Sequence, residues 1–368
     1  MRERTKETEK RQAAARSDKR QREATSGRAD TKLEMRSYFG QDFMDFDALT
    51  PDLVLYAVEQ AFDMVLDGSI TPYPSYINRV YGVRTDDGED KIVKFYRPDR
   101  WSAAAIADEH LFLHDCYNDE VPVVPPIADS EGDTLHEIEL DNDRAFLFAL
   151  YEKTGGRNFD AENDDDWYRL GTLTARVHLA GRIRRAPARL MCHPEAVTRR
   201  YVEEILSAEV MSPEQRSTFE ALCTHMIGTT APLFEDLPVQ RVHGDFHRGN
   251  ILDRPDTGLL VFDFDDMMNG PPVQDLWLLL PDYAAECARE ITMLIDGYEQ
   301  FLPFDRRQLP LIEPLRFMRM IYFLAWQVRQ RFDHSFYLTF PHWGSEAFWN
   351  RELEELRTQR EIVDEQLR

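Results

Sequence analysis

Residues 241–252 read RVHGDFHRGNIL, and residues 259–266 read LLVFDFDD. In the first segment four residues separate Asp245 from Asn250, and Asp263 follows thirteen positions after Asn250. The apolar residues before Asp263 predict a buried strand that would hold its carboxylate rigidly. The two segments therefore predict a polar loop and a strand end that place two carboxylates and one amide in a common site.

The spacing H-x-D-x-x-x-x-N in the first segment indicates phosphoryl transfer. This chemistry needs a carboxylate that receives the proton of the attacking hydroxyl group, and oxygen ligands that hold Mg²⁺ on the phosphates of ATP. We predict that Asp245 and Asp263 are the catalytic carboxylates, with Asp245 as proton acceptor. Asn250 and Asp263 are the predicted Mg²⁺ ligands. The expected cofactors are ATP and Mg²⁺.

The residues around this loop admit other roles. Glycines on both sides of Asp245 let the backbone turn tightly, and His243 is expected to brace the loop by hydrogen bonding. A rival interpretation makes His243, Asp245 and His247 ligands of a binuclear metal hydrolase. The other histidines of the chain form no matching cluster in the sequence. Asp265 and Asp266 are interpreted as caps of the element that follows.

A second group of candidate residues lies in the first half of the chain. Beyond the first 36 residues the sequence has three lysines, Lys91, Lys94 and Lys153. Lys94 lies in the strand pattern IVKF, where a compact ammonium group suits the phosphates of ATP better than a guanidinium group. The alternative is a surface lysine on an edge strand. A strand lysine of this kind is oriented by a carboxylate on the next helix, and we predict Glu109 rather than Asp108.

The expected phosphate loop departs from the usual pattern. No G-x-G-x-x-G sequence precedes the strand predicted at residues 76–83, and the loop predicted at residues 68–75 contains two prolines and Ser75. A serine hydroxyl group and backbone amides can still hold a phosphate. Ser75 is therefore predicted to bind the nucleotide together with the lysine and the glutamate named above, and an ordinary turn is the alternative.

Two further polar residues are predicted to be structural. Asp275 opens an apolar helix, where a carboxylate caps the helix or, if buried, holds backbone amides of the catalytic loop. His178 lies on the apolar face of the helix predicted at residues 164–181, and a core histidine is expected there.

The order of the predicted elements gives the fold class. The predicted helices span residues 52–65, 101–116, 164–181, 195–207, 213–227, 273–280, 284–301, 313–332 and 346–366, and the predicted strands span residues 76–83, 91–96 and 145–151. A small β-rich half followed by a large helical half predicts an α+β, two-lobe fold like that of protein kinases. We assign residues 1–40 to a basic, disordered tail, residues 41–154 to a nucleotide-binding N-lobe, and residues 155–368 to a catalytic and substrate-binding C-lobe.

Charge separates the N-terminal segment from the rest of the chain. Of the 44 Lys or Arg and 67 Asp or Glu, 12 and 7 lie in residues 1–36, which leaves a body with a formal charge of −28. Such a body repels nucleic acid, so no nucleic-acid partner is expected. Four scattered cysteines without a CxxC pair fit a reducing compartment, and no signal peptide or membrane span is predicted. We expect a cytoplasmic protein without a membrane partner.

Three segments carry a resemblance to a known family. Residues 243–252, residues 261–266 and GPPVQDLW at residues 270–277 resemble the aminoglycoside and choline phosphotransferase group of kinase-like folds. The likeness extends from about residue 50 to about residue 349. It implies a kinase fold and an ATP- and Mg²⁺-dependent phosphotransferase activity.

The resemblance also implies an acceptor and site residues. It indicates a serine/threonine protein kinase of bacterial stress response, with Asp245 as proton acceptor, Asn250 and Asp263 as Mg²⁺ ligands and Ser75 in the ATP site. The expected partner is a protein with a Ser or Thr acceptor, and hydroxyl groups of the chain's own basic tail are candidates. One alternative is a small-molecule alcohol kinase of the aminoglycoside or choline type, whose cationic substrate the acidic body would attract. The other is a nucleotide-binding regulator without turnover.

Overall fold

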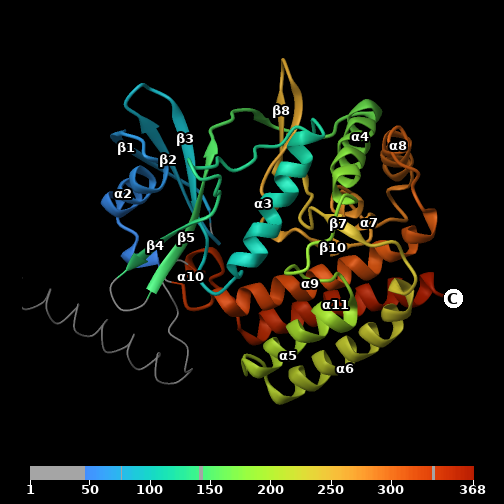
Figure 1. Cartoon of the computed structure of the whole chain (residues 1–368). Coiled ribbons are helices and arrows are strands. Elements are labelled where there is room, and N and C mark those ends of the chain that lie inside the picture. The colour runs from blue at the N-terminus through green and yellow to red at the C-terminus, as the bar shows by residue number, and fades with distance from the viewer. Residues whose placement is uncertain (1–45, 76, 141–143, 334–335) are drawn as a thin grey trace, which may run out of the picture.

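The computed structural model describes residues 46–75, 77–140, 144–333 and 336–368. Within these ranges the chain forms two lobes, a five-stranded antiparallel sheet with helices and a larger helical part (Figure 1). The prediction of an α+β, two-lobe fold is confirmed. The predicted tail at residues 1–40 lies outside the described residues.

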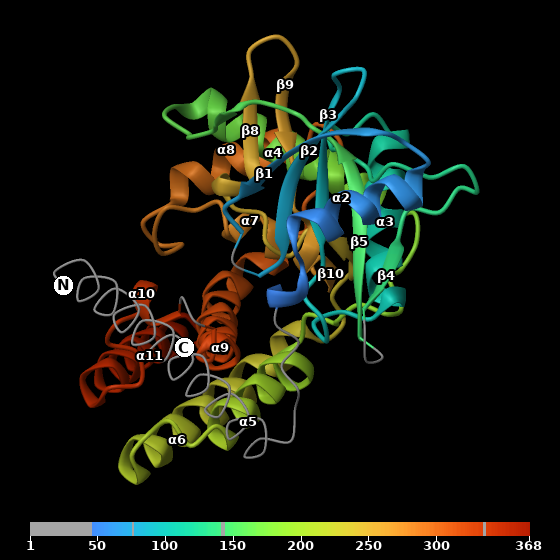
Figure 2. The ribbon, with the colours of Figure 1, turned by 90° about the vertical axis from the view of Figure 1, so that its left-hand side faces the viewer.

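The N-lobe sheet has the strand order β1-β2-β3-β5-β4, and all of its strand pairs are antiparallel. Its elements are η1 (Phe46–Ala48), α2 (Pro51–Phe62), β1 (Leu66–Tyr73), β2 (Arg79–Thr85), β3 (Asp90–Phe95), α3 (Ala103–Asn118), β4 (His136–Leu140) and β5 (Arg144–Glu152). Thr50 caps α2, because its hydroxyl oxygen accepts a hydrogen bond from the backbone N–H of Leu53 at 3.3 Å. Figure 2 shows α2 in front of the sheet.

Alternation along β3 explains why an apolar strand carries Lys94. Val93 and Phe95 lie in the apolar core that α2 shares with the sheet, so Lys94, between them, points to the opposite face. On that face Ala149, the partner of Lys94 on β5, packs with Ile106 of α3. Because α2 and α3 lie on opposite sides of the sheet (Figure 1), the lysine faces α3.

One predicted loop is a strand. Residues 68–75 were assigned to a loop because of their prolines, but most of them belong to β1, which pairs with β2. β1 is an edge strand, where a proline need not remove a ladder hydrogen bond, and Pro72 lies opposite Tyr81. The predicted phosphate loop is therefore the shorter connection between β1 and β2, and β2 begins at Arg79 rather than at residue 76.

The C-lobe contains most of the helices. Its elements are β6 (Arg157–Asn158), α4 (Asp164–Gly181), the π-helical turn η2 (Pro194–Thr198), α5 (Arg199–Ser207), α6 (Pro213–Thr230), η3 (Ala231–Phe234), β7 (Gln240–Val242), η4 (Arg248–Asn250), β8 (Ile251–Arg254), β9 (Gly258–Val261), η5 (Phe264–Asp266), β10 (Met268–Gly270), α7 (Val273–Trp277), α8 (Ala288–Tyr298), η6 (Arg306–Leu311), α9 (Ile312–Gln330), α10 (Phe336–Thr339) and α11 (Glu346–Gln366). The predicted bounds of α4 and α11 agree with the structure. The helix predicted at residues 195–207 is divided between η2 and α5. None of the helices among the described residues combines the length and the apolar character needed to span a bilayer.

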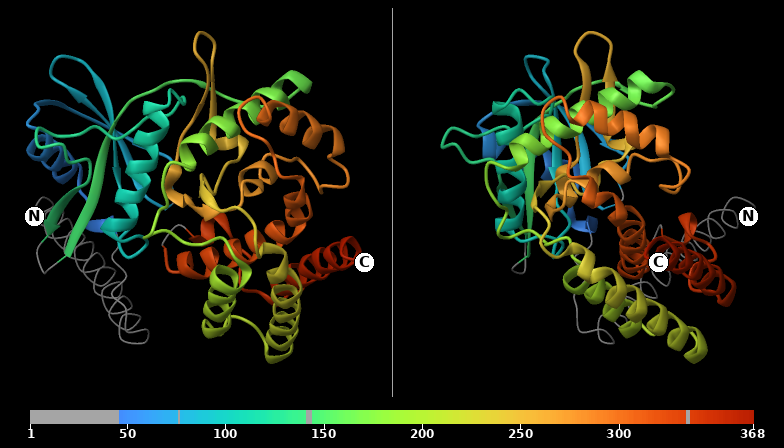
Figure 3. Two further views of the ribbon diagram at one scale, coloured as in Figure 1. Left: turned by 45° about the vertical axis from the view of Figure 1, so that its right-hand side comes forward. Right: turned by 90° about the vertical axis from the view of Figure 1, so that its right-hand side faces the viewer.

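Helix α3 lies between the two lobes (Figure 3). The sheet ends at Glu152, and β6 already pairs with β8 of the C-lobe, so the chain leaves the sheet close to residue 155. The apolar core does not follow this division, because Phe112 of α3 packs edge-on against Phe264 in the large C-lobe core, with ring centroids 5.3 Å apart. The helix that follows the lysine strand is therefore anchored in the other lobe.

Candidate active site

A buried aspartate holds the catalytic loop between β7 and β8. Asp275 is 0% exposed, and its carboxylate accepts hydrogen bonds from the backbone N–H groups of His243 at 2.7 Å and Gly244 at 2.8 Å. Its Oδ2 also lies 3.0 Å from Nε2 of His178, whose Nδ1 lies 3.0 Å from the hydroxyl group of Tyr298. Buried polar groups are stable when hydrogen-bonded in this way. As predicted, Asp275 holds backbone amides of the loop and His178 is a core histidine.

His243 braces the loop from the other side. Its Nε2 donates to the carbonyl oxygen of Phe262 at 3.0 Å, and its Nδ1 accepts from the backbone N–H of Asp245 at 3.2 Å. Both ring nitrogens are therefore engaged, which argues against the rival prediction of a binuclear metal site. Across the described ranges, no group of three or more His, Cys, Asp or Glu residues is placed to hold a metal ion. Gly244 has φ +82°, and a Cβ atom there would lie 2.1 Å from the carbonyl oxygen of Asp266, so only glycine fits.

Asp245, the predicted proton acceptor, lies in a polar environment. Its Oδ1 is 2.7 Å from Nη2 of Arg319 on α9, and its Oδ2 is 3.4 Å from both Nε2 of His247 and Nδ2 of Asn250. Burial alone would raise the pKa of Asp245, but the hydrogen bond from His247 and the charge of Arg319 outweigh it and hold the pKa below its ordinary value. The carboxylate is therefore ionised and able to accept a proton.

The β8–β9 hairpin brings Asn250 and Asp263 together. Ile251 pairs with Val261 across the hairpin, and the backbone N–H of Phe262 donates to the carbonyl oxygen of Asn250 at 3.1 Å. The side-chain N–H of Asn250 donates to the carbonyl oxygen of Asp245 at 3.0 Å, so its amide oxygen is the atom suited to a cation. Asp263 has φ 62° and a half-exposed side chain. One carboxylate and one amide oxygen fit Mg²⁺, which is usually bound by one or two carboxylates together with water and nucleotide phosphates.

Lys94 and Glu109 meet at the interface between the lobes. Nζ of Lys94 lies 3.1 Å from Oδ1 of Asp265, 3.4 Å from Oε1 of Glu109 and 3.6 Å from Oδ1 of Asp263. Burial lowers the pKa of Lys94, but these three carboxylates outweigh it and hold the pKa well above its ordinary value. Asp108, the alternative to Glu109, accepts a hydrogen bond from the backbone N–H of Ala188 instead. The structure thus brings together the lysine and the glutamate that the sequence predicted.

Comparison with known proteins agrees with this arrangement. The model of the phosphotransferase enzyme family matches residues 69–312. The chain belongs to this family. Over 326 residues it is 37% identical to stress response kinase A of Escherichia coli (strain K12), a match that covers 87% of this chain and 95% of the relative. Over 325 residues it is 36% identical to serine/threonine protein kinase RdoA of Salmonella typhimurium (strain LT2), with the same coverage.

Solved structures show that the fold is shared with more distant enzymes. An amicoumacin kinase in complex with AMP-PNP, Ca²⁺ and Ami superposes with a TM-score of 0.66 at 20% identity, which covers 85% of this chain and 93% of that chain. The resemblance inferred from the sequence motifs is confirmed. The chain is therefore a phosphotransferase with a kinase-like fold.

Several residues of the phosphotransferase site were missed or misassigned from the sequence. Asp265 and Asp266 do not cap the next element but pair with Arg100, at 2.9 Å and 2.6 Å. Arg189 is fully buried and donates to the carbonyl oxygens of Ala105 and Asp265, both at 2.6 Å, and to Oε2 of Glu109 at 2.9 Å. No local pattern indicates these contacts, because Arg100 and Asp265 are 165 residues apart in the sequence.

Ser75 lies in the connection between β1 and β2, where the sequence predicted a phosphate loop. Its backbone oxygen accepts a hydrogen bond from Arg79 at 3.4 Å. Among the contacts of the described residues, none joins Ser75 to Lys94 or Asp263. Its role at the nucleotide remains a prediction.

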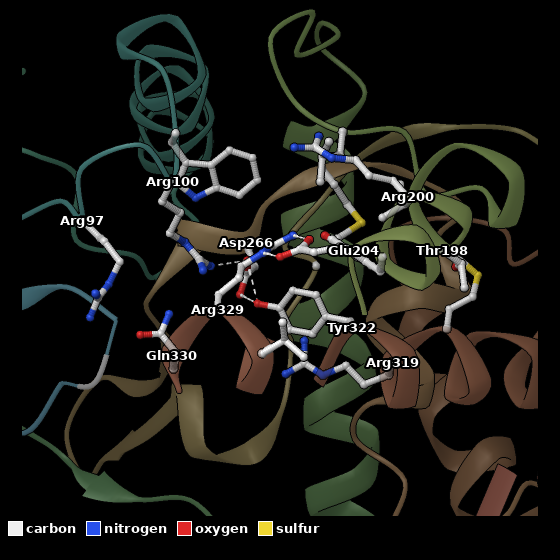
Figure 4. A pocket seen from close by; sticks show the side chains of 18 of the residues that line it. Arg97, Arg100, Thr198, Arg200, Glu204, Asp266, Arg319, Tyr322, Arg329 and Gln330 are labelled. Atoms are coloured by element: carbon white, nitrogen blue, oxygen red, sulfur yellow. Dashed lines mark hydrogen bonds and ion pairs between the residues drawn. The ribbon is translucent and has the colours of Figure 1, made fainter. Parts of the chain in front are cut away.

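A cavity of about 940 Å³ adjoins the catalytic loop of the phosphotransferase (Figure 4). Gly244, Asp266 and Arg319 line it, together with residues of α5 and α9. Since Arg319 also contacts Asp245, the cavity opens beside the predicted proton acceptor. The space is large enough for a small molecule or a short peptide segment.

Proposed function

We propose that the chain is a cytoplasmic, ATP- and Mg²⁺-dependent serine/threonine protein kinase. The observation that carries the proposal is the proximity of Asp245, Asn250 and Asp263 where the catalytic loop joins the β8–β9 hairpin. The side-chain N–H of Asn250 donates to the carbonyl oxygen of Asp245 at 3.0 Å, and Ile251 pairs with Val261 two residues before Asp263. The names of the two relatives, stress response kinase A and serine/threonine protein kinase RdoA, support a protein acceptor and a role in stress response, because both matches extend over nearly the whole chain.

In this proposal each residue has one task. Asp245 accepts the proton of the acceptor hydroxyl group, and Lys94, oriented by Glu109, binds the phosphates of ATP. Asn250 and Asp263 hold Mg²⁺, which neutralises phosphate charge when bound. Asp263 suits the metal better than Asp265 does, because its side chain is 50% exposed whereas that of Asp265 is 6% exposed and is paired with two cations.

A small-molecule alcohol kinase is the second candidate. The fold is shared with an amicoumacin kinase, and the cavity beside the catalytic loop falls within the usual volume range of small-molecule sites. The geometry around Asp245 serves either acceptor equally, because both present a hydroxyl group.

The proposal is tested with purified protein, labelled ATP, Mg²⁺ and a cell lysate. We expect label on Ser or Thr of a protein, and we expect Asp245→Asn to lower turnover by about 10²- to 10⁴-fold while nucleotide affinity stays nearly unchanged. Asp256→Asn, in the exposed turn of the same hairpin, is the matched control and should keep full turnover. Label on a small alcohol alone would refute the protein-kinase proposal, and normal turnover in Asp245→Asn would remove this residue from the mechanism.

A further inference from the structure

The cavity beside the catalytic loop collects positive charge in a chain that is strongly acidic overall. The chain has a formal net charge of −23, yet the cavity is lined by six arginines and three carboxylates. The arginines are Arg97, Arg100, Arg200, Arg319, Arg329 and Arg331. Among the charged side chains that line the cavity, arginines therefore outnumber carboxylates two to one.

Ion pairs within the protein neutralise most of these arginines. Arg100 pairs with two aspartates, Arg329 pairs with Glu204 at 2.6 Å, Arg319 pairs with Asp245 at 2.7 Å, and Arg97 lies 4.0 Å from Asp333. Arg200 forms no hydrogen bond or ion pair within the described part of the chain. Figure 4 shows Arg200 and Arg319 on either side of Tyr322, in the same cavity.

Arg319 connects the cavity to the chemistry. Its guanidinium group contacts Asp245 at 2.7 Å and lies over the ring of Tyr322 at 4.8 Å from the centroid. If the hydroxyl group of an acceptor lies within reach of Asp245, the adjacent chemical groups of that acceptor therefore lie among the arginines that line the cavity. Guanidinium groups bind carboxylates and phosphates with two parallel hydrogen bonds, which makes them selective for these anions.

We propose that the cavity binds an acceptor that carries an anionic group, a carboxylate or a phosphate, next to its reactive hydroxyl group. This inference rests on the proposed function and narrows it to a kinase for Ser or Thr in an acidic or already phosphorylated context. The acidic surface of the body has little effect on this preference, because exposed charges more than about 8 Å away are largely screened at physiological salt. The N-terminal tail is basic, so its Ser and Thr hydroxyl groups lie among positively charged residues. By this proposal the arginines of the cavity disfavour them as acceptors.

The test compares three serine peptides of equal length on the full-length enzyme with Mg²⁺ and ATP. The residues that flank the serine are aspartate, phosphoserine or arginine. We expect kcat/KM for the aspartate or phosphoserine peptide to exceed that for the arginine peptide by on the order of tenfold or more, the effect of one opposite-charge contact exchanged for a like-charge contact. A preference for phosphoserine over aspartate would identify phosphate as the anion, and equal rates would show that a carboxylate suffices. Equal or faster phosphorylation of the arginine peptide overturns the proposal.

Charge reversal at Arg200 identifies the cavity as the source of the preference. Arg200→Glu should lower kcat/KM for the aspartate peptide by about tenfold and leave KM for ATP unchanged. Arg289→Glu on α8, where the side chain is 73% exposed and paired with Asp164, is the matched control and should change neither value. If Arg200→Glu leaves the ratio between the peptides unchanged, the cavity does not select the acceptor.

Peptide binding separates this inference from the proposed function. The three peptides, each with a fluorescent label, are titrated against enzyme loaded with Mg²⁺ and AMP-PNP, and anisotropy is measured. If no peptide is phosphorylated but the acidic peptides bind more tightly than the arginine peptide, and Arg200→Glu removes the difference, the protein-kinase proposal fails and the inference stands for an anionic small acceptor. If the arginine peptide binds as tightly as the others, the inference fails whatever the enzyme phosphorylates.

Discussion

Replacing Lys94 with methionine should strongly destabilise the protein. The lysine is 8% exposed, and its Nζ lies between 3.1 and 3.6 Å from the carboxylates of Asp265, Glu109 and Asp263. Removing one partner of a buried ion pair costs about 3–5 kcal/mol, because the remaining charge is left uncompensated. Arg100 and Arg189 still pair with two of these carboxylates, so we expect a loss near the lower end of this range.

The cost of this substitution should depend on pH. The pKa of Lys94 is raised well above its ordinary value of 10.5, so its stabilising contribution is fully present throughout the neutral range. Burial already raises the pKa of Glu109, with Lys94 and Arg189 opposing it, and loss of the lysine would raise this pKa further. A carboxyl group whose pKa is higher in the folded than in the unfolded protein destabilises the folded state at high pH. This destabilisation disappears as the pH falls through the folded pKa, because the group becomes protonated and neutral. The difference in unfolding free energy between wild type and Lys94→Met should therefore shrink as the pH falls.

Urea unfolding of both proteins between about pH 8 and about pH 5 measures this difference, provided that the transitions are two-state. Lys91→Met on the same strand is the matched control. Lys91 is 7% exposed, but its partners Glu89 and Glu152, each 2.8 Å from its Nζ, have side chains that are 63% and 59% exposed. Because these carboxylates stay hydrated when the lysine is lost, its loss should cost less than about 1 kcal/mol at any pH. Equal costs for the two substitutions, or a cost of Lys94→Met that does not change with pH, would refute the reasoning.

Four other outcomes are expected. Lys94→Arg should keep most of the stability and still lose turnover almost as fully as Lys94→Ala, because a planar guanidinium group cannot take the place of a point charge beside the phosphates; full activity in a steady-state assay would contradict this. Asp263→Ala should raise the Mg²⁺ concentration needed for half-maximal ATP binding more than Asn250→Ala does, because it removes a full charge; an unchanged Mg²⁺ titration for Asp263→Ala would exclude it as the ligand. Asp275→Asn should lower the free energy of unfolding by about 2–4 kcal/mol and slow turnover, because one of the two buried oxygens that accept from backbone N–H groups becomes a donor and the negative charge is lost; an unaltered urea unfolding curve would show that the loop does not depend on it. Burial lowers the pKa of His110 from 6.5 to about 3. As the pH falls below 6.5, the unfolded chain therefore binds a proton at this residue that the folded chain does not bind. The free energy of unfolding falls as a result. In His110→Gln the free energy of unfolding should fall less steeply with decreasing pH than in the wild type, by about 1.4 kcal/mol per pH unit near pH 5. Equal slopes for the two proteins would disprove this expectation.

Sequence patterns predicted the parts of the site that lie close together along the chain. Asp245 and Asn250 share one loop, and a hairpin adds Asp263, so local spacing was sufficient. The strand pattern around Lys94 and the helix that follows it predicted the pairing of this lysine with Glu109, which lies 3.4 Å away. The contact of Arg319 with Asp245 joins residues 74 positions apart, and no local pattern reports such a pair. Net charge and the cavity lining point to substrates of opposite charge, because the acidic body would attract a cation whereas the cavity is rich in arginine.

The strand β1 was missed for a different reason. Pro72 within it and Pro74 directly after it indicated a loop, because proline is excluded from a central strand. β1 lies at the edge of the sheet, where a proline is tolerated. Whether a strand lies at the edge depends on the order of the strands in space, which the sequence of the strand itself does not indicate.

The position of Arg189 has a consequence for control of the enzyme. Its buried guanidinium group joins α3 to the C-lobe through two carbonyl oxygens and Glu109. Swinging α3 outward would leave a charged group buried and unpaired, which is strongly unfavourable. Withdrawal of α3, which would separate Glu109 from Lys94, therefore carries the cost of unpairing Arg189. Any control of the enzyme through movement of this helix would have to supply that free energy.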